Sequence, residues 1–233
     1  TVIDITGKQD NNWRVITTLV HGNEPSGLIA LHRWLCEAEQ KPTTNLRFII
    51  CSVEAASAKP MFSKTYLADS DDLSRYFNGH ADATCAGVKQ RADLITEKIN
   101  EVKPQAVVDI HNSSGCGPAF AFSTVVTPDI LTVASFFCDT IVMANLKQGA
   151  LIEADFNCTT LELECGGSQD EQSHEVAYQG IKQFVDCPNL SKFEQQKTVN
   201  IIYKPLKMLL KADVELCYGE HDEGEDGVTL KSS

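Results

Sequence analysis

The sequence predicts an α/β protein built around one main domain, and three observations support this fold class. Short runs of β-branched and apolar residues alternate with longer segments whose apolar residues recur at helical spacing. The chain has 233 residues, which suits one large domain with at most a small appendage. No internal repeat or low-complexity linker interrupts the alternation. Alternating strands and helices are typical of a sheet whose faces are covered by helices.

The first half of the chain contains three expected strands, two expected helices and one long loop. The strands are residues 14–20 (RVITTLV), 46–53 (LRFIICSV) and 106–110 (AVVDI). The helices are residues 26–39 and 87–102, in which apolar side chains recur on one face. Residues 54–84 are expected to form the loop.

The second half continues the alternation and then changes in character. We expect strands at residues 120–125, 149–156 and 159–164, and helices at residues 128–145 and 170–185. Pro128 suits the first turn of its helix, where a backbone N–H is not needed. After Pro188 there is no clear helical pattern. We therefore assign residues 1–188 to the main domain and residues 189–233 to a short β-rich C-terminal extension.

Composition and charge exclude several classes of protein. Hydrophobic residues make up 42% of the chain and charged residues 22%, which excludes collagen-like, disordered and coiled-coil proteins. No apolar stretch approaches the roughly 18–20 residues that span a bilayer. The net charge of −12 disfavours nucleic acids and membrane surfaces as partners. Nine cysteines, an odd number without a CxxC pair, are typical of reduced thiols, so we expect a cytoplasmic protein.

The motif HGNEPSG, residues 21–27, connects an expected strand to an expected helix. His21 and Glu24 would both reach a point just beyond the carboxyl end of that strand. Gly22 permits a tight chain reversal between them, and Pro25 can start the helix. An H-x-x-E pair occurs easily by chance, so its position at a strand end gives the motif its weight.

A second histidine lies directly after another expected strand, because VDIHNSSG places His111 after residues 106–110. A single histidine at a strand end is more often a hydrogen-bonded structural residue. Together with His21 and Glu24, however, it completes a set of two imidazoles and one carboxylate. This is the ligand set of an open zinc site, which keeps a fourth position for water. The sequence therefore predicts one Zn²⁺ per chain, which would lower the pKa of a bound water to about 7.

The motif TLELECGG, residues 160–167, contributes the carboxylates Glu162 and Glu164. Two residues apart on a strand, they point to the same side, so at least one should face water or metal. Glu164 is nearer the carboxyl end, and we expect it to be the general base that takes a proton from water. An ordinary edge-strand carboxylate is the alternative. Glu162 would place a second negative charge within ~7 Å, which raises the pKa of Glu164 or favours a cationic substrate side chain.

The fourth motif is DDLSRYF, residues 71–77, in the long loop. Arg75 could hold a substrate carboxylate with its two-pronged guanidinium group. A surface arginine paired with Asp71 or Asp72 is the alternative. All four motifs fall in segments that follow strand carboxyl ends, where open α/β sheets bind ligands.

In this order, HGNEPSG, DLSRYF, VDIHNSSG and LELECGG resemble the zinc carboxypeptidase superfamily, and within it the succinylglutamate desuccinylase and aspartoacylase branch. The resemblance covers about residues 13–186. It implies a three-layer α/β/α fold with a mixed, mostly parallel twisted sheet, followed by a small β domain. For the site it implies zinc ligation by His21, Glu24 and His111, catalysis by Glu164 and carboxylate binding by Arg75.

Two departures from the family pattern concern substrate binding. Ser74 stands where the family usually has an asparagine that helps to grip the substrate carboxylate, so one donor is shortened. The family also usually has an arginine upstream of this motif to stabilise the oxyanion, but no arginine occurs between Arg47 and Arg75. Lys64 or Lys59 would have to supply a point charge instead.

The leading hypothesis is a zinc-dependent hydrolase that cleaves an amide bond near a carboxylate. It would be a metallocarboxypeptidase or an N-acyl-amino-acid deacylase, acting on a small peptide or an N-acyl amino acid. One alternative is a catalytically weak or inactive metal-binding or regulatory module, which Ser74 and the missing arginine favour. Another is cysteine chemistry at Cys116 or Cys165, although small buried cysteines are common in cores. The oligomeric state stays open.

Overall fold

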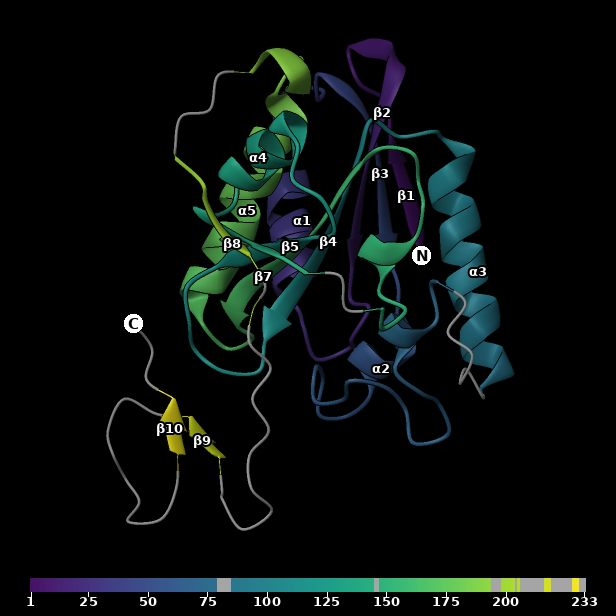
Figure 1. Cartoon of the computed structure of the whole chain (residues 1–233). Coiled ribbons are helices and arrows are strands. Elements are labelled where there is room, and N and C mark those ends of the chain that lie inside the picture. Colours follow the sequence, from purple (N-terminus) through teal and green to yellow (C-terminus); the bar gives the residue numbers. More distant parts are fainter. Residues whose placement is uncertain are drawn as a thin grey trace.

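The computed structural model describes residues 1–78, 85–144, 147–193, 198–203, 205, 216–218 and 228–230 (Figure 1). Its strands are β1 (Val2–Ile5), β2 (Gln9–Thr18), β3 (Thr44–Ile50), β4 (Ala106–Ser113), β5 (Phe120–Ser123), β6 (Thr140–Met143), β7 (Thr159–Gly167), β8 (Asn200–Tyr203), β9 (Leu216–Tyr218) and β10 (Val228–Leu230). Its α-helices are α1 (Ser26–Glu37), α2 (Val53–Ser57), α3 (Ala86–Glu101), α4 (Pro128–Ser135) and α5 (Glu171–Asp186). Short 3₁₀ turns are η1 (Leu73–Arg75), η2 (Leu151–Glu153) and η3 (Leu190–Lys192).

Strands β1 to β8 form one mixed sheet in the order β1-β3-β2-β4-β7-β5-β6-β8. Strands β3, β2, β4 and β7 are parallel neighbours in the middle of this sheet. Strand β1 is antiparallel to β3, and β5 is antiparallel to β7. The carboxyl ends of β2, β4 and β7 therefore meet at one edge of the sheet. Strands β9 and β10 pair with each other in a separate two-stranded sheet.

Helices cover both faces of the sheet and so produce three layers (Figure 1). Helices α1, α4 and α5 pack on one face, against side chains such as Ile16, Val108 and Leu161. Helix α3 packs on the other face, against Val15 and Val107. On this second face, the short turn η2 contacts β7. The predicted fold class, a three-layer α/β/α arrangement with a mixed, mostly parallel sheet, is confirmed.

Side chains alternate between the two faces along each strand, and this alternation decides where the polar groups lie. Asp109 and His111 follow Val107 at intervals of two, so they point to the face that α3 covers. In the pairing of β4 with β7, Asp109 is opposite Glu162 and His111 is opposite Glu164. All four polar side chains consequently occupy one face, near the carboxyl ends of the central strands.

The predicted helix at residues 128–145 is wrong in its second half. Helix α4 ends at Ser135, and strand β6 follows at Thr140–Met143. Most of this stretch is apolar, and an apolar run does not distinguish a buried helix from a buried strand by its periodicity. The β-branched residues at the start of β6 favour the strand that forms there.

The predicted strand at residues 149–156 is also wrong, because this segment is a loop that contains η2. Glu153 Oε2 accepts hydrogen bonds from the backbone N–H groups of Gln148, Gly149 and Ala150, at 2.8, 2.7 and 3.3 Å. These local bonds satisfy donors that a strand would have paired with a neighbour. The expected loop 54–84 is interrupted by η1, and its first residues belong to α2. The sequence pattern does not predict strand β1.

Strand β8 pairs with β6 and forms one edge of the main sheet, although it lies beyond residue 188. The division of the chain into residues 1–188 and 189–233 stays a prediction, and most residues after 203 lie outside the described ones. Within the described residues, no helix is both long and apolar enough to cross a membrane.

Candidate metal centre

The loop between β2 and α1 carries His21 and Glu24 to the carboxyl edge of the sheet. Gly22 is required here because of a close approach to α2. A Cβ on Gly22 would lie 2.6 Å from Ala56 N and 2.7 Å from the carbonyl carbon of Ala55. Gly22 N also donates a 2.9 Å hydrogen bond to Thr65 O. The loop is thus held against two backbone segments that follow β3.

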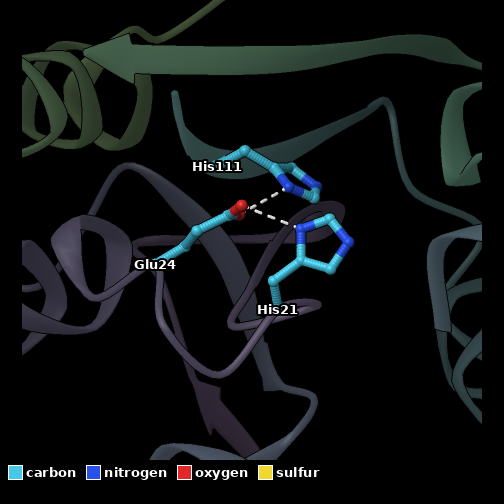
Figure 2. Close-up of side chains that lie close together, drawn as sticks. All are labelled: His21, Glu24 and His111. Atoms are coloured by element: carbon cyan, nitrogen blue, oxygen red, sulfur yellow. Dashed lines mark hydrogen bonds and ion pairs between the residues drawn. The ribbon is translucent and has the colours of Figure 1, made fainter. Parts of the chain in front are cut away.

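Glu24 lies between the two histidines, and its carboxylate faces one nitrogen of each ring (Figure 2). Glu24 Oε1 is 2.8 Å from His21 Nδ1, and Glu24 Oε2 is 2.7 Å from His111 Nδ1. The ring centroids of His21 and His111 are 5.2 Å apart in a T-shaped arrangement. The structure therefore brings the three predicted metal ligands together, although Glu24 and His111 are 87 positions apart in the sequence.

The donor atoms of these three residues suit a shared cation. One ligand atom from each lies within 4.8 Å of the others. Glu24 Oε2 is buried and has no hydrogen-bond partner among the described residues, despite its closeness to His111 Nδ1. The ion pair with His111 is the contact that this oxygen makes, and a cation between the rings could take the place of the proton in it. Two imidazoles and one carboxylate are also a common ligand set for divalent metals.

The Nε2 atom of each imidazole contacts a further carboxylate. His21 Nε2 is 2.9 Å from Asp72 Oδ1, and His111 Nε2 is 2.9 Å from Asp109 Oδ2. Thr17 Oγ1 in turn donates a 2.6 Å hydrogen bond to Asp109 Oδ1. Such carboxylates fix the ring orientation of metal-binding histidines and leave the other nitrogen free to bind. Asp109, His111 and Glu162 form a second group of possible ligands that shares His111.

Sequence reasoning missed these supporting roles of Asp72 and Asp109. For Asp109 a signal existed, because a residue two positions before His111 on a strand points to the same face. The sequence suggests Asp72 only as a surface partner of Arg75. Its approach to His21, 51 residues away, depends on how the long loop folds back.

Hydrogen bonds and charge set the pKa values of this group. Burial lowers the pKa of His21, but hydrogen bonds to Asp72 and Glu24 outweigh it and raise the pKa to about 9. Burial opposes the ionisation of Glu24, but the imidazoles of His111 and His21 lower its pKa to about 2. Burial likewise lowers the pKa of His111, and Asp109 and Glu24 raise it well above its usual value. A metal ion must displace protons from both rings when it binds.

Glu164 lies beside this centre, opposite His111 in the pairing of β4 with β7. Ser113 Oγ donates a 3.0 Å hydrogen bond to Glu164 Oε2, which orients the carboxylate. Burial raises the pKa of Glu164. Burial also raises the pKa of Glu162 to about 7, with Asp109 and Glu164 adding to the effect. The two glutamates share one face of β7, as the sequence predicts.

Ser74 and Arg75 are turned toward Asp72. Ser74 is buried, and its Oγ donates a 2.6 Å hydrogen bond to Asp72 Oδ1. Arg75 Nε is 3.3 Å from Asp72 Oδ2, and its Nη1 donates to Gln148 Oε1 at 2.9 Å. The structure thus shows the pairing with Asp72 that was the alternative for Arg75. The side chain of Arg75 is still 49% exposed, which leaves part of the guanidinium accessible.

Lys64 is exposed in the loop next to the site. Its neighbour Thr65 accepts the hydrogen bond from Gly22, the residue after His21. Cysteine chemistry is disfavoured at Cys165, because this thiol is buried and burial raises its pKa well above the usual value. Cys116 is exposed, with its Sγ 3.7 Å from Asp170 Oδ1.

A cavity of about 650 Å³ lies beside η2. Thr160 of β7 and Thr124, just after β5, contribute to its walls. Thr160 is two residues before Glu162, so it points to the same face of β7 as Glu162 and Glu164. The loop around η2 supplies further lining residues, among them Lys147, Glu153 and Asp155.

The fold and the cluster together define a three-layer α/β protein with three candidate metal ligands at the carboxyl edge of its mixed sheet. Solved structures share this fold. Succinylglutamate desuccinylase from Chromobacterium violaceum matches with a TM-score of 0.74 and 14% identity, over 91% of this chain and 76% of that one. Succinylglutamate desuccinylase from Vibrio parahaemolyticus matches with a TM-score of 0.69 and 14% identity, over 98% and 78%.

A third match is the product-bound ectoine utilization protein EutE (DoeB) from Ruegeria pomeroyi. Its TM-score is 0.66 and its identity 19%, over 88% of this chain and 65% of that one. No protein-family model matches the sequence, and neither does any curated protein. At these identities the matches establish the fold. They confirm that the chain resembles the succinylglutamate desuccinylase and aspartoacylase branch in structure.

The close packing of Gly22 gives a first test of how the centre is held. We expect Gly22→Ala to lower the free energy of unfolding by about 1–3 kcal/mol, because the added Cβ meets backbone atoms that cannot turn away. Zinc affinity is expected to fall with it, since the loop carries His21 and Glu24, two of the three candidate ligands. Gly87→Ala in α3 is the control, because a Cβ there meets nothing within 4 Å. Urea unfolding and zinc titration of both variants check the prediction, and equal behaviour would contradict it.

Proposed function

We propose that this protein is a zinc-dependent hydrolase that cleaves an amide bond near a carboxylate. The observation that carries the proposal is the convergence of His21, Glu24 and His111, with a supporting carboxylate behind each imidazole. The proposed metal is one Zn²⁺ per chain, because two imidazoles and a carboxylate form an open zinc site. The proposed location is the cytoplasm, which the nine cysteines without a CxxC pair support.

The substrate proposed is an N-acyl amino acid, with a small peptide as the second candidate. The names of the structural matches support a deacylase, because two of them are desuccinylases. A metallocarboxypeptidase would use the same metal site and differ in which side of the amide carries the anchoring carboxylate. The net charge of −12 supports a small-molecule substrate over a nucleic acid or a membrane surface.

In the proposed mechanism, bound zinc would polarise the scissile carbonyl and lower the pKa of a water molecule. Glu164 takes the proton from the attacking water and delivers it to the leaving nitrogen. Ser113 holds the Glu164 carboxylate in place for both transfers. The accessible part of Arg75 binds the substrate carboxylate, and Lys64 or Lys59 steadies the oxyanion.

A second candidate function is a metal-binding or regulatory module without turnover. The observation that favours it is the hydrogen bond from Ser74 to Asp72, which directs this hydroxyl away from a substrate role. Purified protein that holds zinc but hydrolyses neither peptides nor N-acyl amino acids would support this second function.

Glu164→Gln tests the proposed general base. We expect the variant to keep one zinc per chain while kcat falls by about 10²–10⁴-fold, because glutamine cannot accept the proton. Zinc content by elemental analysis and steady-state rates on N-acyl amino acids are the measurements. Glu97→Gln, an exposed glutamate of α3, is the matched control and should leave both values unchanged. Full activity in Glu164→Gln would remove this residue from the mechanism.

The placement of Glu162 leads to a prediction about substrate charge. Five carboxylates lie around the centre, and the DDLSRYF motif supplies a single arginine, Arg75. An extra negative charge on a substrate would be repelled by these carboxylates. The five are Glu24, Asp72, Asp109, Glu162 and Glu164. At about pH 8.5, we expect Glu162→Gln to lower kcat/KM for lysine-bearing substrates and to raise it for glutamate-bearing ones, each by about 3- to 10-fold, because glutamine removes the negative charge that Glu162 carries above its pKa of about 7.

The comparison of N-acyl-lysine with N-acyl-glutamate is the measurement for Glu162→Gln. Glu153→Gln on the neighbouring loop is the control, because Glu153 Oε2 already binds three backbone N–H groups. Equal losses of kcat/KM on both substrates, with an unchanged pH profile, would show that the charge of Glu162 does not influence which substrate is preferred.

A further inference from the structure

A buried asparagine next to a proposed metal ligand joins three segments of the site. Asn112 follows His111 on β4 and is 4% exposed. Its Oδ1 accepts a 3.1 Å hydrogen bond from Ser26 N, and its Nδ2 donates to Gly166 O at 2.9 Å. One partner is a backbone donor and the other a backbone acceptor, so the orientation of the amide group is fixed. The same Nδ2 donates a 2.7 Å hydrogen bond to Ser26 Oγ.

The residues that Asn112 binds lie close in sequence to the groups that do the proposed chemistry. Ser26 comes two residues after Glu24, and Gly166 comes two residues after Glu164. Because Asn112 is itself adjacent to His111, one side chain connects the segments of two ligands and of the proposed base. Ser26 and Gly166 are also buried, so water does not replace these bonds if they are lost.

Each partner of Asn112 is constrained in its own element. Ser26 is the first residue of α1, where backbone N–H groups have no partner within the helix. Its hydroxyl accepts from Asn112 and is therefore left to donate to His174 Nδ1 of α5, 2.8 Å away. Gly166 has φ +103°, and a Cβ there would lie 2.7 Å from Ser173 Oγ and 2.8 Å from Gly117 O. Asn112 thus links β4 to the start of α1 and to the end of β7.

We propose that Asn112 is a positioning residue that sets the distances between Glu24, His111 and Glu164 through its bonds to Ser26 and Gly166. The inference rests on the proposed function for its catalytic consequence. The bonds themselves do not depend on a metal. The hydrogen bonds of Asn112 go to Ser26 and Gly166, so it acts through these neighbouring segments.

The test compares Asn112→Ala and Asn112→Asp with the same substitutions at Asn45. Asn45 is the matched control, because it is also 4% exposed on a central strand, and its Oδ1 accepts a hydrogen bond from Gly7 N at 2.9 Å. It lies at the start of β3, at the opposite end of the sheet from the carboxyl edge. If Asn112 served only to stabilise the fold, its substitutions and those of Asn45 would have similar effects on zinc affinity and kcat. Asn112→Asp keeps the acceptor for Ser26 N but cannot donate to Gly166, so it carries the test if the alanine variant does not fold.

In zinc-loaded protein, we expect both Asn112 variants to weaken zinc binding by about 10- to 100-fold, the range seen for groups that orient ligands. We also expect kcat to fall while KM changes less than twofold, because Glu164 is displaced without loss of substrate contacts. The Asn45 variants should leave zinc affinity and kcat within twofold of the parent. Zinc affinity within twofold of the parent in both Asn112 variants would overturn the proposal.

Amide hydrogen exchange in metal-free protein separates this inference from the proposed function. We expect Asn112→Ala to speed exchange at Ser26 by at least about tenfold, because its amide loses a buried acceptor. The Asn45 variants should not change exchange at Ser26. If the parent binds no zinc, the proposed function fails, and the exchange rate at Ser26 still decides whether Asn112 fixes this segment. Unchanged exchange at Ser26 would overturn the positioning role.

Discussion

The site depends on one shared carboxylate, because Glu24 faces a nitrogen of His21 and a nitrogen of His111 at once. This arrangement needs two imidazoles to approach within 5.2 Å of each other, although both attract protons in this acidic surrounding. The carboxylates of Asp72 and Asp109 make the approach possible by holding the far nitrogens. Together the groups form an alternating row of acids and imidazoles in which a divalent cation can replace protons.

The parallel strands explain why such a row can be built here. Strands β2, β4 and β7 are neighbours and run in the same direction, so their carboxyl ends deliver side chains to one place. The face that carries Asp109, His111, Glu162 and Glu164 is covered by α3 on one side and by the short turn η2 near β7. A helix over β7 would have forced these carboxylates into an apolar layer, at a high desolvation cost. The loop around η2 leaves a cavity of about 650 Å³ instead.

The same carboxylates also affect the proposed binding of a substrate. Ser74 and Arg75 contact Asp72, which in turn contacts His21. Part of the hydrogen-bonding capacity of this motif, which resembles a carboxylate-binding segment, therefore serves to hold His21. In the proposed hydrolase, substrate anchoring would depend on the accessible part of Arg75 and on lysines of the nearby loop. We propose that such a centre, rich in acids, favours substrates that carry little negative charge or a cationic group.

Local sequence patterns determined much of this protein. The central strands, α1, α3 and α5 follow from periodicity, and the positions of His21, Glu24, His111 and Glu164 at strand ends made one site at one sheet edge predictable. Periodicity failed where it carries little information, as in the apolar run that divides into α4 and β6, and in the η2 loop, where the Glu153 carboxylate replaces strand pairing. The roles of Asp72 and Asn112 were decided by tertiary structure alone. Asp72 contacts His21, 51 residues away, and Asn112 contacts Ser26 and Gly166, 86 and 54 residues away. Hydrogen bonds over such separations exist only once the long loop and the strands are packed. Sequence specified which chemical groups reach the edge of the sheet, and packing specified which of them face one another.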